Sequence, residues 1–492
     1  MPAAPGASDR SILKLIETMR LIRGQRFVVL AFHAIIGISC FAQSDTSSES
    51  DKANAFFDRV FDEQVARYPE RQTNLGIKGD YGKWNDTSDA MAERELDITK
   101  ANLAWFKESI DYEKLDTQTK ISYLMWVERA ENQIQNFKYR YYNYPVNQLF
   151  GRHTGVPALL INMHQAADEG DAEHYVGRLK GVGDVFDRLI ENLKLREELG
   201  MLPPKFFFPR AIESSRNVIS GAPFDDSTDD SAPWEDFRTK VQKLDLVEPR
   251  KVQLQQEAKY ALVDIVKPAY EKLIAFLEDQ ETRATTDDGV WKFDDGDAFY
   301  SEALRLTTTT ELTAEKIHQI GLNEVARIHD EMREIMKTVE FDGDLKAFFE
   351  FMRTDEQFYY PNTDEGKEAY IQRAVEVIDD MEERLDSLFI TKPEADLIVK
   401  RVEAFREKSA GTPFYQRPSP DGSRPGIYYA NLYDTVNMPK YKLEGLAYYE
   451  GVPGHHMQLA LAQQLEGIPK FRKFGSYTAY IEGWGLYCEL LP

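Results

Sequence analysis

Two short blocks near the C-terminal end of the chain contain the residue types that bind a metal and activate water. In the first block, Glu450 is followed by the adjacent pair His455 and His456. The second block, Tyr480–Glu489, adds further carboxylates. Two imidazoles and several carboxylates are the usual ligands of a zinc hydrolase, so the sequence predicts zinc as the cofactor. The position just before Glu450, where such a site needs a histidine, is Tyr449.

The local pattern around these residues predicts a broken helix. Leu443 to Glu450 is expected to be helical, residues 451–454 interrupt it with two glycines and a proline, and a helix is expected to resume from His455. Adjacent helical residues point about 100° apart, so only one histidine of the pair can face a metal. We favour His455 as the ligand, with His456 as the alternative. Glu450 is the candidate general base, and Glu482 is the candidate carboxylate ligand.

The elements that must position this site are mostly helices. Apolar residues recur at three- and four-residue steps over long stretches, which predicts a mainly α fold. Pro268 is expected to kink or divide a helix over residues 252–280. A turn at Asp421–Gly426 and an aromatic strand at Ile427–Leu432 form a small β element before the helix that carries Glu450. A helix after the N-cap Thr313 carries a stripe that is expected to be buried, namely Ile317, Ile320, Gly321, Val325, Ile328, Met332 and Ile335.

Length and charge narrow the function. The 492 residues are enough for a large core, and the net charge of −23 disfavours a nucleic-acid partner because phosphates would be repelled. Only Cys40 and Cys488 are present, and Cys40 lies in a removable segment, so no disulfide is expected.

The N-terminal region has the features of an export signal. Three arginines precede the apolar run Phe27–Ala42, which is too short and interrupted for a comfortable membrane span. Residues 1–42 are therefore predicted to be a leader and signal peptide, residues 43–52 a linker, and residues 53–492 one domain. The protein is expected to be secreted, periplasmic or held at the cell envelope. Contact with a membrane would come only from an uncleaved signal or from a lipid anchor at Cys40.

Several motifs together resemble the domain-of-unknown-function 885 family, which is grouped with zinc metallopeptidases of the His-Glu-helix, gluzincin-like type. The matching stretches are Asp421–Gly426, Glu450–Gln458, Tyr477–Tyr480 and Glu482–Glu489. The resemblance implies a helical, envelope-associated, hydrolase-like protein. The family pattern has His where this chain has Tyr449, and it continues well past Glu489, so the C-terminal part of the domain is expected to be missing here.

These observations support two functional hypotheses. The first is a zinc-dependent peptidase-like hydrolase, in which Glu450 activates the attacking water, Arg424 binds a substrate carboxylate and Tyr429 supports the oxyanion. The ligand would be a peptide or a small peptide-like molecule. The alternative is an inactive peptidase-fold protein that binds peptides or an envelope partner, and Tyr449 favours it.

Overall fold

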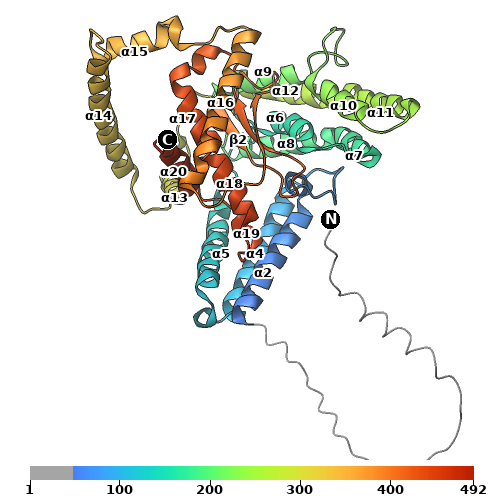
Figure 1. Ribbon diagram of the computed structural model, residues 1–492. Coiled ribbons are helices and arrows are strands. Elements are labelled where there is room, and N and C mark those ends of the chain that lie inside the picture. Colours follow the sequence, from blue (N-terminus) through green and yellow to red (C-terminus); the bar gives the residue numbers. More distant parts are fainter. Residues whose placement is uncertain (1–47, 492) are drawn as a thin grey trace, which may run out of the picture. The chain divides into compact units, whose positions relative to one another are not determined.

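The computed structural model describes residues 48–491, so the predicted signal segment Phe27–Ala42 lies outside the described residues. It confirms a mainly α fold with one small sheet in the part of the chain that it describes (Figure 1). The α-helices are α2 Glu49–Arg67, α3 Pro69–Asn74, α4 Asp89–Ser109, α5 Thr117–Asn136, α6 Arg152–Ala158, α7 Glu169–Lys180, α8 Val182–Glu198, α9 Phe207–Val218, α10 Ala232–Gln242, α11 Glu248–Ala261, α12 Lys267–Glu281, α13 Gly296–Thr308, α14 Ala314–Thr338, α15 Leu345–Thr354, α16 Asp364–Leu388, α17 Lys440–Glu450, α18 His455–Gln464, α19 Lys470–Lys473 and α20 Thr478–Cys488.

The first described helix, α2, begins earlier than the apolar pattern predicts. It starts at Glu49, inside the predicted linker 43–52, because Ser48 and Asp51 form a capping box. The Ser48 side chain accepts from the Asp51 backbone N–H, and the Asp51 carboxylate accepts from the Ser48 N–H. Two polar residues that were predicted to belong to a linker therefore form the N-terminal cap of the helix.

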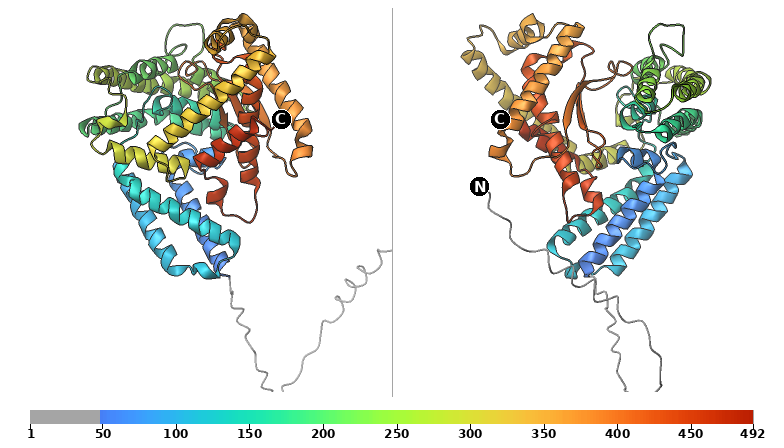
Figure 2. Two further views of the ribbon diagram at one scale, coloured as in Figure 1. Left: turned by 90° about the vertical axis from the view of Figure 1, so that its left-hand side faces the viewer. Right: turned by 45° about the vertical axis from the view of Figure 1, so that its right-hand side comes forward.

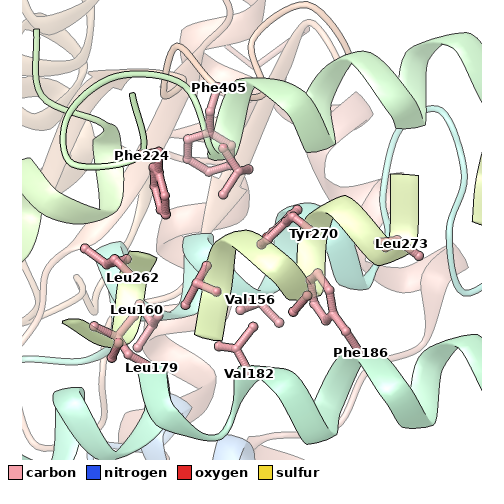
Figure 3. Packing of buried hydrophobic residues seen from close by; sticks show 14 of the residues in the cluster. Val156, Leu160, Leu179, Val182, Phe186, Phe224, Leu262, Tyr270, Leu273 and Phe405 are labelled. Atoms are coloured by element: carbon pink, nitrogen blue, oxygen red, sulfur yellow. The ribbon is translucent and has the colours of Figure 1, made fainter. Parts of the chain in front are cut away.

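The largest core lies among the helices from α6 to α12. Phe186 of α8 and Tyr270 of α12 are fully buried there, with ring centroids 4.6 Å apart (Figure 3). The chain reaches α12 through one π-helical turn, Leu262–Val266, which begins directly after α11. Pro268 follows that turn in the first turn of α12, so the irregularity expected near Pro268 occurs as a π-helical turn, and the chain stays helical through it.

The sheet has three strands, β1 Leu397–Arg401, β2 Pro413–Gln416 and β3 Gly426–Ala430, in the order β1-β3-β2. β3 runs parallel to β1 and antiparallel to β2. In the right-hand view of Figure 2, the sheet lies between α16–α17 on one side and the green helices on the other. Every residue of β3 is buried, because the strand is central and covered on both faces.

The connection between α17 and α18 depends on close backbone contacts. A Cβ at Gly454 would stand 2.1 Å from the carbonyl oxygen of Tyr449 and 2.2 Å from that of Tyr448. A Cβ at Gly451 would stand 2.5 Å from the carbonyl oxygen of Ala447. The predicted break at residues 451–454 is confirmed, and the two glycines explain how α18 can begin directly against the end of α17.

The predicted burial of the α14 stripe is wrong. Ile320, Val325 and Ile335 are exposed, and Met336 is the one buried residue of the helix. Among the described elements, α14 packs mainly on α15. None of the helices in residues 48–491 combines the length and apolar character needed to cross a membrane.

Candidate functional site

Three helices bring the two predicted blocks together. Tyr449 and Glu450 end α17, His455 begins α18, and Glu482 lies on α20. The Tyr449 hydroxyl donates to Glu482 Oε2 at 2.5 Å, and His455 Nε2 lies 3.7 Å from the same oxygen. The rings of Tyr449 and His455 meet edge to face, with centroids 4.7 Å apart. The structure therefore gathers a phenol, an imidazole and a carboxylate at one point.

Residues of α20 fit closely around this group. A Cβ at Gly485 would stand 2.8 Å from the Tyr449 ring, so the absence of a side chain there makes room for the phenol. The indole N–H of Trp484 donates to the carbonyl oxygen of Pro453 at 2.9 Å. That bond ties α20 to the turn between α17 and α18, so the Glu-Gly-Trp-Gly sequence positions Glu482 against the first block.

Glu450 is a buried carboxyl, with 6% of its surface exposed. Burial, with the neighbouring charge of Glu482, raises the pKa of Glu450 to about 8. A carboxyl with such a pKa stays largely protonated near neutral pH.

The raised pKa predicts a pH-dependent stability. The folded pKa is above the unfolded value, so this contribution is present below about pH 4.3 and is lost as the pH rises through 8. Glu450→Gln removes the titration, and we expect its unfolding free energy to fall less than that of the unaltered protein between pH 5 and 8. When Glu450 is fully titrated, the two proteins should differ in this pH-dependent loss of unfolding free energy by about 1.4 kcal/mol for each unit by which the pKa of Glu450 is raised. Urea unfolding of both proteins at several pH values measures it, and parallel profiles would contradict the assigned pKa.

His456 is held away from this group. Its Nε2 lies 2.9 Å from the carbonyl oxygen of Ala395 and its Nδ1 lies 3.0 Å from the hydroxyl of Tyr415. A carbonyl only accepts, so Nε2–H donates and Nδ1 accepts from Tyr415. Burial lowers the pKa of His456 to about 4, which keeps the ring neutral. Because both nitrogens are engaged, the structure does not bring His456 to Glu482 as a second imidazole ligand.

Arg424, predicted to bind a substrate carboxylate, is buried and contacts segments that are distant in sequence. Its guanidinium donates to the carbonyl oxygen of Asn74 at 2.8 Å and contacts the sulfur of Met163. Only 5% of its surface is exposed. The structure therefore places Arg424 between segments that are distant in sequence, with two of its five N–H donors engaged.

Tyr429, predicted to support an oxyanion, lies on the opposite face of the sheet from α17. It stacks on Phe414 of β2 with ring centroids 4.7 Å apart. Alternation along β3 turns Tyr428 the other way, into the cluster formed by α16 and α17. Burial raises the pKa of Tyr428 well above its usual value, with smaller contributions from Tyr370 and Glu450. Of the two tyrosines, it is Tyr428 that faces the side of Glu450.

Arg417 is a neighbour of the site that the sequence reasoning missed. It follows β2, between Tyr415, which bonds His456, and Pro418, whose carbonyl accepts from Gln463 of α18 at 3.3 Å. Burial lowers its pKa, and within residues 48–491 it forms no ion pair with an acidic side chain. Burial also lowers the pKa of His455; Glu482 opposes this shift and Arg417 adds to it. The only signal in the sequence was a cation two residues after Tyr415, on the same face of an extended strand.

The ligand set can be compared with what zinc requires. His455 Nε2 and Glu482 Oε2 are 3.7 Å apart. Two ligands of one tetrahedral zinc ion are expected about 3.3 Å apart, so this pair has nearly that spacing. The third position is Tyr449, whose pKa is raised by burial and by its hydrogen bond to Glu482, so the phenol keeps its proton. No three His, Cys, Asp or Glu side chains in the described part of the chain form a group that could hold a metal. These residues do not fit a tightly bound zinc ion.

The chain is similar to one protein family and to solved structures of bacterial proteins. A family model described as "Bacterial protein of unknown function (DUF885)" matches residues 69–492. A crystal structure described as a "putative lipoprotein" from Colwellia psychrerythraea is similar, with a TM-score of 0.80 and 24% identity over 90% of this chain and 78% of that one. A "putative lipoprotein of unknown function" from Shewanella oneidensis has a TM-score of 0.58 and 16% identity, over 90% of this chain and 77% of that one. No curated protein matches.

Proposed function

Since this chain belongs to the bacterial DUF885 family of proteins of unknown function, we propose that it is a secreted or envelope protein with a peptidase-like site that binds peptides without holding zinc tightly. The observation that carries this proposal is the position of Tyr449. Its phenol bonds Glu482 and packs on His455, where a metallopeptidase needs a third ligand. In this proposal the site keeps the carboxylates and the histidine of a metallopeptidase but binds zinc weakly, because a phenol replaces one ligand.

Unpaired polar groups beside the site support a peptide ligand. Within the described residues, His455 Nδ1 and Gln458 Oε1 are buried without a hydrogen-bond partner, one turn apart on α18. Arg417 adds a half-buried cation without an acidic partner. β2 is an edge strand, so an extended peptide could pair with it through main-chain hydrogen bonds. Such a peptide would reach Arg417 where β2 ends, and its terminal carboxylate is the group that an arginine binds best.

The proposed location rests on two observations. The sequence has an apolar run after three arginines, and the similar structure from Colwellia psychrerythraea is described as a "putative lipoprotein". Both favour a protein that acts outside the cytoplasm, where peptides from the envelope or the surroundings would be its ligands.

Binding of peptides with free and amidated C-termini tests this function. We expect an apolar tetrapeptide with a free carboxylate to bind at least about tenfold more tightly than its amide, because a hydrogen-bonded charge pair is lost. Arg417→Gln should remove this difference. Arg401→Gln, which changes the arginine at the end of the other edge strand β1, is the matched control and should keep it. Isothermal titration measures each affinity.

Two results would contradict these statements separately. If neither peptide binds the unaltered protein, the proposed peptide-binding function is wrong. If both peptides bind equally well and Arg417→Gln changes nothing, peptide binding stands and the role of Arg417 is wrong.

Peptide hydrolysis is the second candidate function. The buried Glu450 and the ligand-like spacing of His455 and Glu482 favour it. Hydrolysis requires a bound zinc ion, and this site lacks a third protein ligand for it. An assay of peptide cleavage with zinc added in excess therefore separates the two candidate functions. Cleavage by the unaltered protein that is lost in Glu450→Gln would favour hydrolysis over binding alone.

A further inference from the structure

A large cavity lies beside the candidate site and shares Gln458 with the proposed peptide site. Its volume is about 1110 Å³, and its walls come from α5, α13 and the segment from α18 to α20. Figure 1 shows these elements, which are distant in sequence, close together on one side of the molecule. Neither Tyr449, Glu450, His455 nor Glu482 lines it.

One wall of the cavity is apolar. The side chains on it belong to α18, α20 and the segment between them, with Phe389 at the end of α16. They include Met457, Leu461, Ala462, Leu465, Ile468, Ile481 and Trp484. A continuous apolar wall exposed to water binds an apolar molecule favourably, with about 0.8 kcal/mol for each methylene group buried. Small-molecule sites typically have volumes of about 300–1,000 Å³, and this cavity is larger, so it has room for a long acyl chain.

Charged side chains also line the cavity. Three of them are arginines, Arg129, Arg305 and Arg472, and two are acids, Glu128 and Glu311. Arg305 donates to Asn132 and Glu302, and Arg472 donates to Gln118 and Ser122.

Arg129 is different from the other two arginines. Its side chain is exposed, and within residues 48–491 no hydrogen bond or ion pair engages its guanidinium. It lies near the backbone of Gly475, where an added Cβ would stand 3.3 Å from Arg129 Nη1. The neighbouring acid, Glu128, accepts from the hydroxyl of Tyr477 at 3.2 Å. The cavity thus presents one arginine free to bind an anion.

We propose that this cavity binds an amphipathic anion, with its acyl chain on the apolar wall and its carboxylate or phosphate head at Arg129. The apolar wall would bind the acyl chain of such a molecule, and Arg129 would bind its anionic head. A small anion would leave the apolar wall in water, and an uncharged hydrocarbon would gain nothing from Arg129. This site shares Gln458 with the proposed peptide site, but its anion-binding residue is Arg129 and not Arg417, so substitutions can separate the two.

The test uses dodecanoate, dodecyl phosphate and dodecanol with the full chain, at concentrations where each is monomeric. We expect at least one of the two anions to bind about tenfold or more tightly than dodecanol, because a charged hydrogen bond is formed. The tighter of the two identifies the head group. Decanoate should bind about tenfold more weakly than dodecanoate, because two methylene groups are lost. Isothermal titration measures the affinities, and a change in tryptophan fluorescence that is lost in Trp484→Phe is an independent signal.

Two variants locate the site. Arg129→Gln should reduce the affinity for the anion to that for dodecanol, and Ala462→Trp should block both by filling the apolar wall. Arg59→Gln, an arginine on α2 that pairs with Glu63, is the control and should leave binding unchanged. The proposal is overturned if no probe binds, if dodecanol binds as tightly as the anions, or if Arg129→Gln binds the anion like the unaltered protein.

Discussion

Tyr449→His is expected to bind zinc at least about a thousandfold more tightly than the unaltered protein. A phenol must lose its proton before it can bind zinc, which costs about 1.36 kcal/mol for each pH unit below its pKa. From the ordinary phenol pKa of about 10 this amounts to about 4 kcal/mol at pH 7, and the raised pKa of Tyr449 increases the cost. A neutral imidazole binds without that cost.

The geometry supports the same result. Imidazole is shorter than phenol by roughly the 2 Å length of a zinc–nitrogen bond. The hydroxyl of Tyr449 therefore lies about where a metal held by a histidine at this position would lie, 2.5 Å from Glu482 Oε2. His455 Nε2 lies 3.7 Å from the same Glu482 oxygen. A histidine at position 449 would thus complete a set of two imidazoles and one carboxylate.

Isothermal titration with zinc compares the two proteins. Tyr448→His is the matched control, because it adds an imidazole one residue earlier, where the side chain bonds Glu444 and turns away from Glu482. Equal zinc affinities for Tyr449→His and the unaltered protein would mean that position 449 does not face a metal. The assignment of His455 and Glu482 as its partners would then fail as well.

Gly454→Ala is expected to destabilise the protein by about 3 kcal/mol or more, in the range of a buried steric clash. The new Cβ would stand 2.1 Å from the carbonyl oxygen of Tyr449, and backbone at the end of α17 cannot move as a flexible side chain can. Relief of the clash requires α17 and α18 to separate, which would also displace His455 from Glu482.

Urea unfolding followed by circular dichroism measures this loss. Gly321→Ala is the control, because Gly321 lies within α14 and an added Cβ meets nothing within 4 Å. Its exchange should stabilise the helix by up to about 1 kcal/mol. A Gly454→Ala protein as stable as the unaltered one would show that the turn between α17 and α18 is looser than the contacts indicate.

Several features of this protein follow from local sequence. Helical periodicity and the capping residue Thr313 predicted α14, and Pro268 marked the change from α11 to α12. Glycine and proline between residues 451 and 454 predicted the break before His455. These signals are local, because caps, periodicity and turns depend on residues within one or two turns of the chain.

The tertiary structure decided which side chains meet. A sequence pattern shows that two neighbours on a helix or strand point in different directions, but not what covers each direction. Packing against β2 turned His456 to Tyr415 and left His455 beside Glu482, and packing of the N-terminal segments engaged Arg424 through Asn74.

The same physical reason applies to α14 and to Arg417. The stripe on α14 has the period of a buried helix, yet burial needs a second surface, and in the described residues α14 packs mainly on α15. Arg417 had no motif to mark it, and it became a candidate only because the strand before it runs beside α18. The sequence by itself determined the mainly helical class, several helix ends and the chemical groups available to the site. Only the long-range contacts decided which of those groups face one another. These contacts join residues that are far apart in the chain, and the distance between two residues in sequence does not show whether their side chains meet.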